Sequence, residues 1–469
     1  MIARPFLVPL AALAALALVA GCEPKRTAAP WVNPLDVLEP RLAKDVKDNN
    51  YILQRLEFGR IATQLGCDLR AKPRLQEAFE QLGAERSNTA AALTTEQLKY
   101  YKGETYERAM LAVYLGTMEY RAGEYNNARI YFSRALSADR AAVVKDSTPS
   151  SYGDDFGLAF FWISRAFAKL DDADQCAIAL RKAAAAHPER KDAAKEVAED
   201  QKQAKEWEKA YLEGETWAAK TFSDPKKPDL SMEGIVNLAE VRGTAGDAPA
   251  ALPGAAPASP VVRMTDAREE FFTPAYQAAA NTVLSVEVGR PPFKYLGGLE
   301  GERTEFGRSL VPPRAVRVYV DGHYAGQAFE VVDLWDQAAT QDRIGEKDAA
   351  QAGKAVAKRV LSYMPYVGSA VGHWNIQGDV RHWTTLPGKV FVFAARLAPG
   401  PHTVRLEMYD CRGNLLPRWT NTYYGVGVPA EGEVCLNLVP YADGDNRLPP
   451  DLVDKALKAG ATPAAAYGH

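Results

Sequence analysis

The fold of the first half of the chain is decided by residues 109–142, which read AMLAVYLGTMEYRAGEYNNARIYFSRALSADRAA. Apolar and small residues recur in this stretch with a period near 3.6, and the pattern breaks at Gly123. Such a period predicts two amphipathic helices joined by a short turn. Because Gly116 has no side chain, we expect the second helix to approach the first closely at that residue.

A second stretch, residues 157–190, reads GLAFFWISRAFAKLDDADQCAIALRKAAAAHPER and aligns with the first. Ile163 and Ser164 occupy in it the places of Leu115 and Gly116. Both stretches resemble the tetratricopeptide (TPR) repeat, which is a helix–turn–helix unit with a small residue in its first helix. This resemblance predicts that the helices stack as repeated pairs.

A TPR-like array implies a concave surface that binds a peptide or another protein. We expect residues 49–82 to supply an earlier helical pair and residues 193–214 to supply a capping helix, which meets the three units that such an array needs. The side chains expected to line a partner groove are Tyr114, Tyr120, Tyr125, Tyr131 and Arg165. The alternative is a plain helical bundle in which these aromatic residues only pack together.

The second half of the chain predicts a mostly antiparallel sheet. Short runs of alternating apolar and polar residues are separated by glycine-containing turns, as in β-strands. These runs are residues 282–288, 315–320, 390–397, 403–409, 419–424 and 434–439. In one of them Val404 and Leu406 fall on one face and Arg405 on the other, which is typical of a strand that is buried on one side.

Together these patterns predict an α+β multidomain protein, with an N-terminal TPR-like helical repeat domain and a C-terminal antiparallel β-sandwich-like domain. Residues 243–260 read GTAGDAPAALPGAAPASP, and a stretch with so few large apolar residues cannot offset its ordering entropy. The expected segments are a signal peptide at 1–21, a tether at 22–44, the helical domain at 45–242, a flexible linker at 243–262, the β-rich domain at 263–445 with a helical insertion at about 333–371, and a tail at 446–469.

The N-terminus predicts a lipid-anchored protein of the bacterial envelope. The apolar run at 6–20 has the length of a signal sequence and is short for a membrane-spanning helix. It leads into Ala-Gly-Cys at 20–22, which resembles the lipobox of bacterial lipoproteins. That resemblance implies acyl chains on Cys22; the alternative is an ordinary signal or anchor with an incidental cysteine. Because residue 23 is Glu rather than the aspartate of inner-membrane retention, we expect the periplasmic face of the outer membrane.

Two motifs in the second half extend the resemblance. Residues 289–294 read GRPPFK, and residues 378–387 read GDVRHWTTLP. With the lipobox and the TPR-like half, they resemble an uncharacterised family of bacterial envelope lipoproteins that share a G-x-x-P-x-K segment and a D-x-R-x-W-x-x-L-P segment. The resemblance covers most of residues 100–440 in outline. It implies an architecture and a location but no activity.

The second motif holds the densest cluster of polar and aromatic side chains. Arg381 is suited to bind a carboxylate or phosphate, and Trp383 is suited to stack on a sugar ring. The candidate ligand contacts are Lys294, Asp379, Arg381, His382 and Trp383. The alternative is structural: Asp379 pairs with Arg381 or caps a turn, and Trp383 fills the interior of the sandwich.

Composition and the lack of known motifs narrow the function. The chain has 56 Lys and Arg against 59 Asp and Glu, without a basic block, so no nucleic-acid partner is expected. Five cysteines are too few for a disulfide-dense scaffold; Cys411 and Cys435 either form a bridge or remain free thiols. The sequence contains no nucleophile elbow, metalloprotease, P-loop or dinucleotide motif. We therefore predict no catalytic residue, metal ligand or cofactor.

These observations favour a non-enzymatic, lipid-anchored periplasmic adaptor that binds another envelope protein through its TPR-like domain. The alternative is a lipoprotein that binds cell-wall glycan or peptide through the β domain, with peptidoglycan as its partner and Lys294, Arg381 and Trp383 as contacts. A third hypothesis is an enzyme of unrecognised type.

Overall fold

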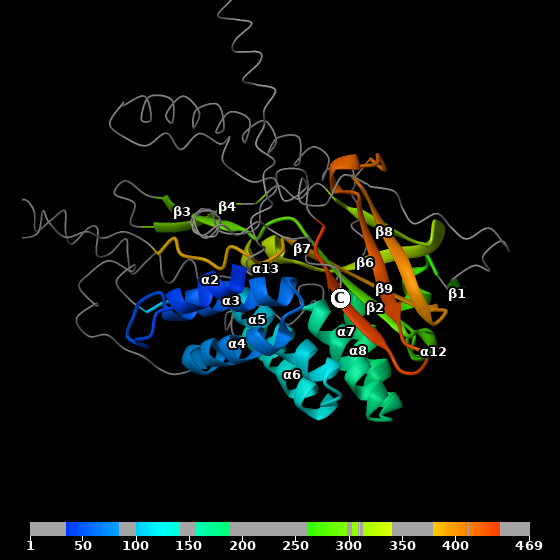
Figure 1. The fold of residues 1–469 in the computed structure, drawn as a ribbon, viewed down its shortest axis with the longest axis horizontal. Helices are drawn as coiled ribbons and strands as arrows, with labels where there is room; N and C mark the ends of the chain where they lie inside the picture. Colours follow the sequence, from blue (N-terminus) through cyan, green and yellow to red (C-terminus); the bar gives the residue numbers. More distant parts are fainter. Residues whose placement is uncertain are drawn as a thin grey trace, which may run out of the picture.

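The fold was obtained as a computed structural model (Figure 1). It describes residues 34–83, 100–140, 156–186, 261–263, 265–297, 303–307, 309, 313–339, 379–410 and 412–440. The expected signal peptide, Cys22, capping helix and tail, together with residues 243–260 of the expected linker and most of the helical insertion, lie outside these residues; residues 261 and 262 of the expected linker belong to a strand. The described part contains helices and a mostly antiparallel sheet, so the α+β class is confirmed. Within it, no helix has the length and apolar character needed to cross a membrane.

Three helical hairpins make up the N-terminal half. They are α3 (Tyr51–Gln64) with α4 (Asp68–Gly83), α5 (Thr105–Arg121) with α6 (Tyr125–Arg140), and α7 (Gly157–Lys169) with α8 (Ala173–Ala186). The short helix α2 (Pro34–Leu38) and the 3-10 turn η1 (Glu39–Arg41) precede them. The helical pairs predicted at 49–82, 109–142 and 157–190 are therefore confirmed.

The three hairpins follow one sequence pattern. Each has a small residue in its first helix, at Gly59, Gly116 and Ser164. Sixteen residues after the small residue, each hairpin has a large buried residue in its second helix, at Leu75, Phe132 and Leu180. The turn between the helices has a residue with positive φ, at Gly66, Gly123 and Asp171. A β-carbon at Gly116 would lie 2.4 Å from the ring of Phe132, so the close approach of α5 and α6 requires glycine.

The C-terminal half forms one curved sheet of eight strands, in the order β10-β2-β7-β6-β5-β8-β9 with β1 paired to β7. The strands are β1 (Val261–Arg263), β2 (Thr282–Val288), β5 (Ala315–Val320), β6 (His323–Asp333), β7 (Lys389–Leu397), β8 (Gly400–Tyr409), β9 (Asn421–Val428) and β10 (Val434–Leu438). All pairs are antiparallel except β10 with β2. All six predicted runs contain a strand.

Smaller elements surround this sheet. The strands β3 (Phe293–Gly297) and β4 (Arg303–Gly307) form a separate two-stranded ribbon. The short helices are α11 (Arg268–Phe271), α12 (Pro274–Ala279) and α13 (Leu334–Ala339), and η6 (Pro417–Trp419) is a 3-10 turn. Helix α13 is the described beginning of the predicted helical insertion.

The predicted two-sheet sandwich is wrong, because one sheet curls around its own core. Strand β6 pairs with β5 through residues 323–328 and with β7 through residues 329–333. Register shifts lie between Val318 and Tyr319 and between Glu330 and Val332, and such bulges bend strands. Alternating apolar residues are common to sandwiches and to curled sheets, so the sequence pattern does not separate them.

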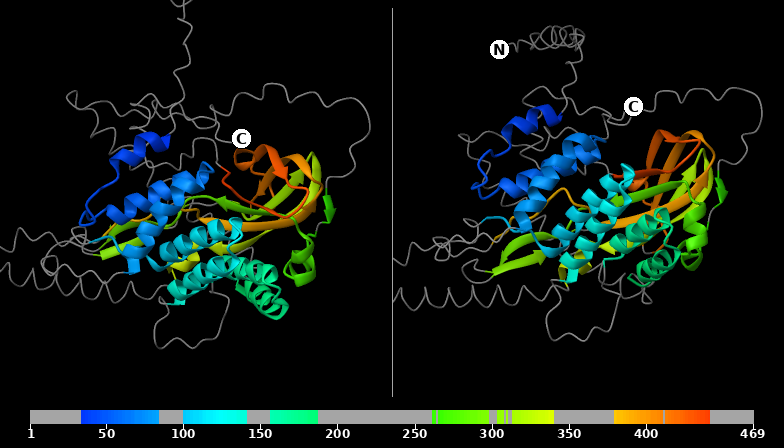
Figure 2. Two further views of the ribbon diagram at one scale, coloured as in Figure 1. Left: turned by 60° about the horizontal axis from the view of Figure 1, so that its bottom comes forward. Right: turned by 90° about the horizontal axis from the view of Figure 1, so that it is seen from below.

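The helices cover the outer face of this sheet at β2, β7 and the second half of β6 (Figures 1 and 2). Strands β2 and β7 are buried on both faces. Leu284 and Phe391 point to the inner core, whereas Val283 and Val392 belong to the same apolar cluster as the helices. The helical and β-rich parts therefore share one hydrophobic core, although the linker that joins them lies outside the described residues.

We expect Gly116→Ala to lower the free energy of unfolding by about 1–3 kcal/mol, because the new methyl group overlaps the buried ring of Phe132. The matched control is Gly427→Ala on β9, where a β-carbon meets no atom within 4 Å. It should change stability by less than about 0.5 kcal/mol. Urea unfolding midpoints measure both, and equal effects would show that the close helix approach is not under steric constraint.

Candidate functional site: the helix–sheet seam

The polar residues singled out in the sequence meet where the first helices of the hairpins contact the sheet. We call this contact the helix–sheet seam. On the helical side it contains Glu57, Arg60, Glu104, Glu107, Tyr114, Tyr120 and Arg165, and on the other side Glu287, Lys294, residues 379–386 and Glu433. Sequence positions that lie hundreds of residues apart are in direct contact here.

Trp383 is fully buried in the seam. Its backbone N–H donates to Glu107 Oε1 at 2.6 Å, and its indole N–H donates to Thr385 Oγ1 at 2.8 Å. Its ring meets the ring of Tyr114 edge to face, with centroids 5.9 Å apart. No ring face is left to stack on a sugar, so the structural alternative holds. The side chain packs between helices and sheet, however, and not inside a sandwich.

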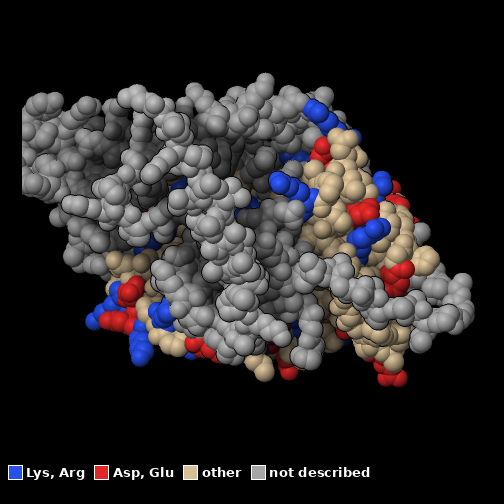
Figure 3. Space-filling model, turned by 45° about the horizontal axis from the view of Figure 1, so that its top comes forward, with Lys and Arg blue, Asp and Glu red and all other residues tan. Residues whose placement is uncertain are grey.

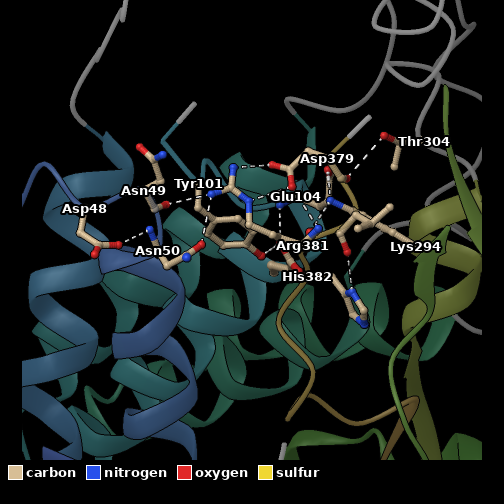
Figure 4. A network of polar contacts seen from close by, with 12 residues as sticks. Asp48, Asn49, Asn50, Tyr101, Glu104, Lys294, Thr304, Asp379, Arg381 and His382 are labelled. Atoms are coloured by element: carbon tan, nitrogen blue, oxygen red, sulfur yellow. Dashed lines mark hydrogen bonds and ion pairs between the residues drawn. The ribbon is translucent and has the colours of Figure 1, made fainter. Parts of the chain in front are cut away.

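Arg381 binds a carboxylate of its own chain (Figure 4). Its Nε and Nη2 donate to the two oxygens of Asp379, each at 2.8 Å, and its Nη1 donates to the carbonyl oxygen of Asn49 at 3.0 Å. The neighbouring His382 places Nδ1 3.0 Å from the carbonyl oxygen of Val380. The predicted Asp379–Arg381 pair is confirmed, and it fixes this segment against the N-terminus of α3.

Lys294 joins the two predicted motifs. Its ammonium group donates to Glu104 Oε1 at 2.6 Å and to the carbonyl oxygen of Arg381 at 3.0 Å. Burial alone would lower the pKa of Lys294, but the charges of Glu104 and Glu107 outweigh it and raise the pKa. The lysine therefore stays charged as a link between the G-x-x-P-x-K segment, helix α5 and the second motif.

The most deeply buried ion pair of the seam joins Arg60 on α3 to Glu287 on β2. Both side chains are at most 3% exposed. Tyr114 donates its hydroxyl to Glu287 Oε2 at 3.2 Å, and the guanidinium of Arg60 lies 4.7 Å from the centroid of the Tyr114 ring. An isolated charge at this depth is costly, so each member requires the other.

A second ion pair joins Arg165 on α7 to Glu433, which directly precedes β10. Lys169 and the Tyr120 hydroxyl also contact Glu433, each at 3.2 Å. Burial would raise the pKa of Glu433, but the charge of Arg165 outweighs this effect and lowers it. Arg165 also donates to the carbonyl oxygen of Gln277 at 3.1 Å.

Cys435 lies beside this pair and has a free thiol. Its Sγ is 3.0 Å from Glu433 Oε1, and burial raises the pKa of the thiol. For Cys435 the free-thiol alternative is therefore the one that the structure shows. Cys411, its predicted bridging partner, lies outside the described residues.

The predicted partner groove requires a correction. Tyr114, Tyr120 and Arg165 are at most 4% exposed and contact the chain's own β-rich part. Tyr125 packs against Tyr120, with ring centroids 5.2 Å apart. Tyr131, further along α6, packs against Phe79 on α4 instead. The face predicted to bind a partner is covered by the sheet, because a helical pattern indicates which face is apolar but not what covers it.

Sequence reasoning missed several seam residues, of which Glu57 is the most unusual. Its Oε1 accepts hydrogen bonds from the backbone N–H and the hydroxyl of Thr384, each at 2.7 Å. Burial raises the pKa of Glu57 to about 7. One signal in the sequence pointed to this interface: the charged Glu287 within the otherwise mostly apolar run TVLSVEV.

The geometry of the seam favours a structural role. Four ion pairs lie in it, and within the described residues no group of three His, Cys, Asp or Glu side chains is arranged to hold a metal ion. No protein-family model matches the chain, and no curated protein matches it.

Glu57 should make stability depend on pH. In the folded protein it keeps its proton up to about pH 7, whereas the unfolded chain releases it near 4.5. The folded state is therefore favoured at low pH and loses about 3 kcal/mol as the pH rises from below 4.5 to above 7. We expect Glu57→Gln to be more stable than the wild type, by a much larger margin at pH 8 than at pH 5. Urea unfolding at both values measures this.

The control for that experiment is Glu80→Gln, which changes an exposed carboxylate on α4. It should leave the stability difference between pH 5 and pH 8 as in the wild type. If Glu57→Gln also leaves it unchanged, the buried acid is not the source of the pH dependence.

Proposed function

We propose that this protein is a lipid-anchored, non-enzymatic adaptor of the bacterial envelope that binds another envelope protein. Acyl chains on Cys22 hold it at the periplasmic face of the outer membrane, and the Pro- and Ala-rich segment after Cys22 connects them to the folded body. The resemblance to envelope lipoproteins of the TPR-like class supports this proposal. So does the pattern of small, turn and large residues that all three helical hairpins share.

The observation that carries the proposal is the seam. It engages Lys294 of the first motif and Asp379 and Arg381 of the second in contacts within the chain, and it joins helices and sheet through buried ion pairs. Such an arrangement favours a rigid body whose outer surfaces contact other molecules. The second helices α4 and α6 lie on the side of the hairpins away from the sheet, so we place the partner contact there (Figure 2).

The outer face of β5, β6 and β8 supports a second candidate, a protein that binds cell-wall glycan. The guanidinium groups of Arg317 and Arg405 lie 4.6 Å from the ring centroids of Tyr409 and Tyr319, and both arginines are exposed. Aromatic rings beside cations suit an acidic sugar polymer. On the face drawn in Figure 3, basic and acidic side chains are interspersed over the described surface. In this candidate the glycan contacts the outer face of β5, β6 and β8 and does not contact Trp383 and Arg381.

The adaptor proposal predicts a specific partner after mild crosslinking in cells and affinity purification. The control bait carries residues 1–33 of this chain on an unrelated soluble domain, so that both baits share the anchor and differ in the folded body. We expect at least one envelope protein to be enriched with the full chain alone. Identical partners from both baits, or acyl-free N-termini in mass spectra of the mature protein, would contradict the proposal.

The glycan candidate is separated from the adaptor by sedimentation with purified peptidoglycan. If it holds, the chain pellets with the polymer and Tyr319→Ala reduces the pelleted fraction several-fold. The control Tyr295→Ala removes a 43% exposed tyrosine on β3 and should have no effect. A chain that stays in the supernatant rules out this candidate and leaves the adaptor.

A further inference from the structure

A cavity of about 370 Å³ lies between α4, α5 and α6. It is lined by Phe79, Glu119, Asn127, Ile130, Tyr131 and Arg134. None of these residues belongs to the seam, and only Tyr131 was among the candidate partner contacts. A volume of this size accommodates one large side chain together with its backbone.

Apolar side chains form one wall of the cavity. The rings of Phe79 and Tyr131 meet edge to face, with centroids 5.5 Å apart. Beside them Ile130 is 52% exposed and adds its apolar surface to the wall. Covering this wall would remove apolar surface from water, so the wall favours an apolar ligand group.

The polar residues of the cavity determine the charge that the ligand should have. Glu119 is only 6% exposed and is already neutralised by Lys72, whose Nζ lies 2.9 Å from its Oε1. Arg134 is exposed at the rim and forms no ion pair with any residue that the structure describes. The charge of Arg134 is therefore available to a ligand, and a negative group on the ligand would pair with it.

We propose that this cavity binds an extended segment of a partner polypeptide in which an acidic residue stands two positions from an apolar one. The apolar side chain packs against Phe79, Ile130 and Tyr131. The carboxylate pairs with Arg134, and the side-chain amide of Asn127 hydrogen-bonds to the peptide backbone. The proposal rests on the adaptor function and specifies the chemistry of its partner.

The adjacent positions of these groups on α6 support an extended ligand. Ile130, Tyr131 and Arg134 lie within about one turn of each other, and Asn127 lies one turn earlier on the same face. The apolar contact and the charged contact are therefore separated by about one helical turn. Alternate side chains of an extended peptide point to the same side and lie about 7 Å apart, which is a similar distance.

The first test is selection of random heptapeptides displayed on phage against the immobilised full chain. We expect enriched peptides to combine a large apolar residue with Asp or Glu within two positions. The most enriched peptide is then labelled with fluorescein, and its binding is measured by fluorescence polarisation. Replacing its acid by the matching amide should weaken binding about five- to tenfold. Enrichment of peptides without an acid would overturn the proposal.

Variants of the protein locate the binding. Arg134→Ala should weaken the labelled peptide about five- to tenfold, Ile130→Asp should abolish its binding, and Arg134→Glu should favour a peptide with Lys in place of the acid. The control is Arg418→Ala, which removes an exposed arginine on η6. All substituted positions are exposed, and circular dichroism confirms that each variant is folded. Unchanged binding in both Arg134→Ala and Ile130→Asp would overturn the proposal.

The crosslinking experiment distinguishes the two proposals. If the envelope partner is lost from Arg134→Glu, both are supported. If the partner is retained by Arg134→Glu, the cavity proposal fails and the adaptor function stands. If the wild type captures no specific partner, the adaptor function fails.

Discussion

The burial of Glu287 constrains the rest of the structure. Its carboxylate lies on the outer face of β2, in a strand that is buried on both sides. A carboxylate in such a place requires a positive partner, because removing either member of a buried pair leaves an uncompensated charge that costs about 3–5 kcal/mol. The partner is Arg60, and it comes from the first helical hairpin. The sheet therefore depends on the helices for its electrostatic balance.

The same dependence is repeated along the interface and bears on function. Arg165 with Glu433 and Lys294 with Glu104 are further pairs whose members come from opposite sides of the seam. Ion pairs require defined geometry, so the seam favours one fixed orientation of the helices on the sheet. These polar residues are engaged within the chain, and the cavity at Ile130 lies outside the seam.

Much of the secondary structure could be predicted from the sequence, because local periodicity determines it. The strand at 282–288 and the helical pairs around Gly116 and Ser164 lie where the pattern places them. The tertiary contacts could not be predicted in the same way. Alternation shows that Val404 is buried but not whether a second sheet or the same sheet covers it. Nor does the helical stripe that carries Tyr114 show that Glu287 of the chain itself meets it.

The most direct test of the account is differential scanning calorimetry of the intact chain. If helices and sheet form one body through the seam, heating should give one transition whose calorimetric enthalpy equals its van't Hoff enthalpy. Two transitions, or a calorimetric enthalpy well above the van't Hoff value, would show that the two parts unfold independently and that the seam does not join them.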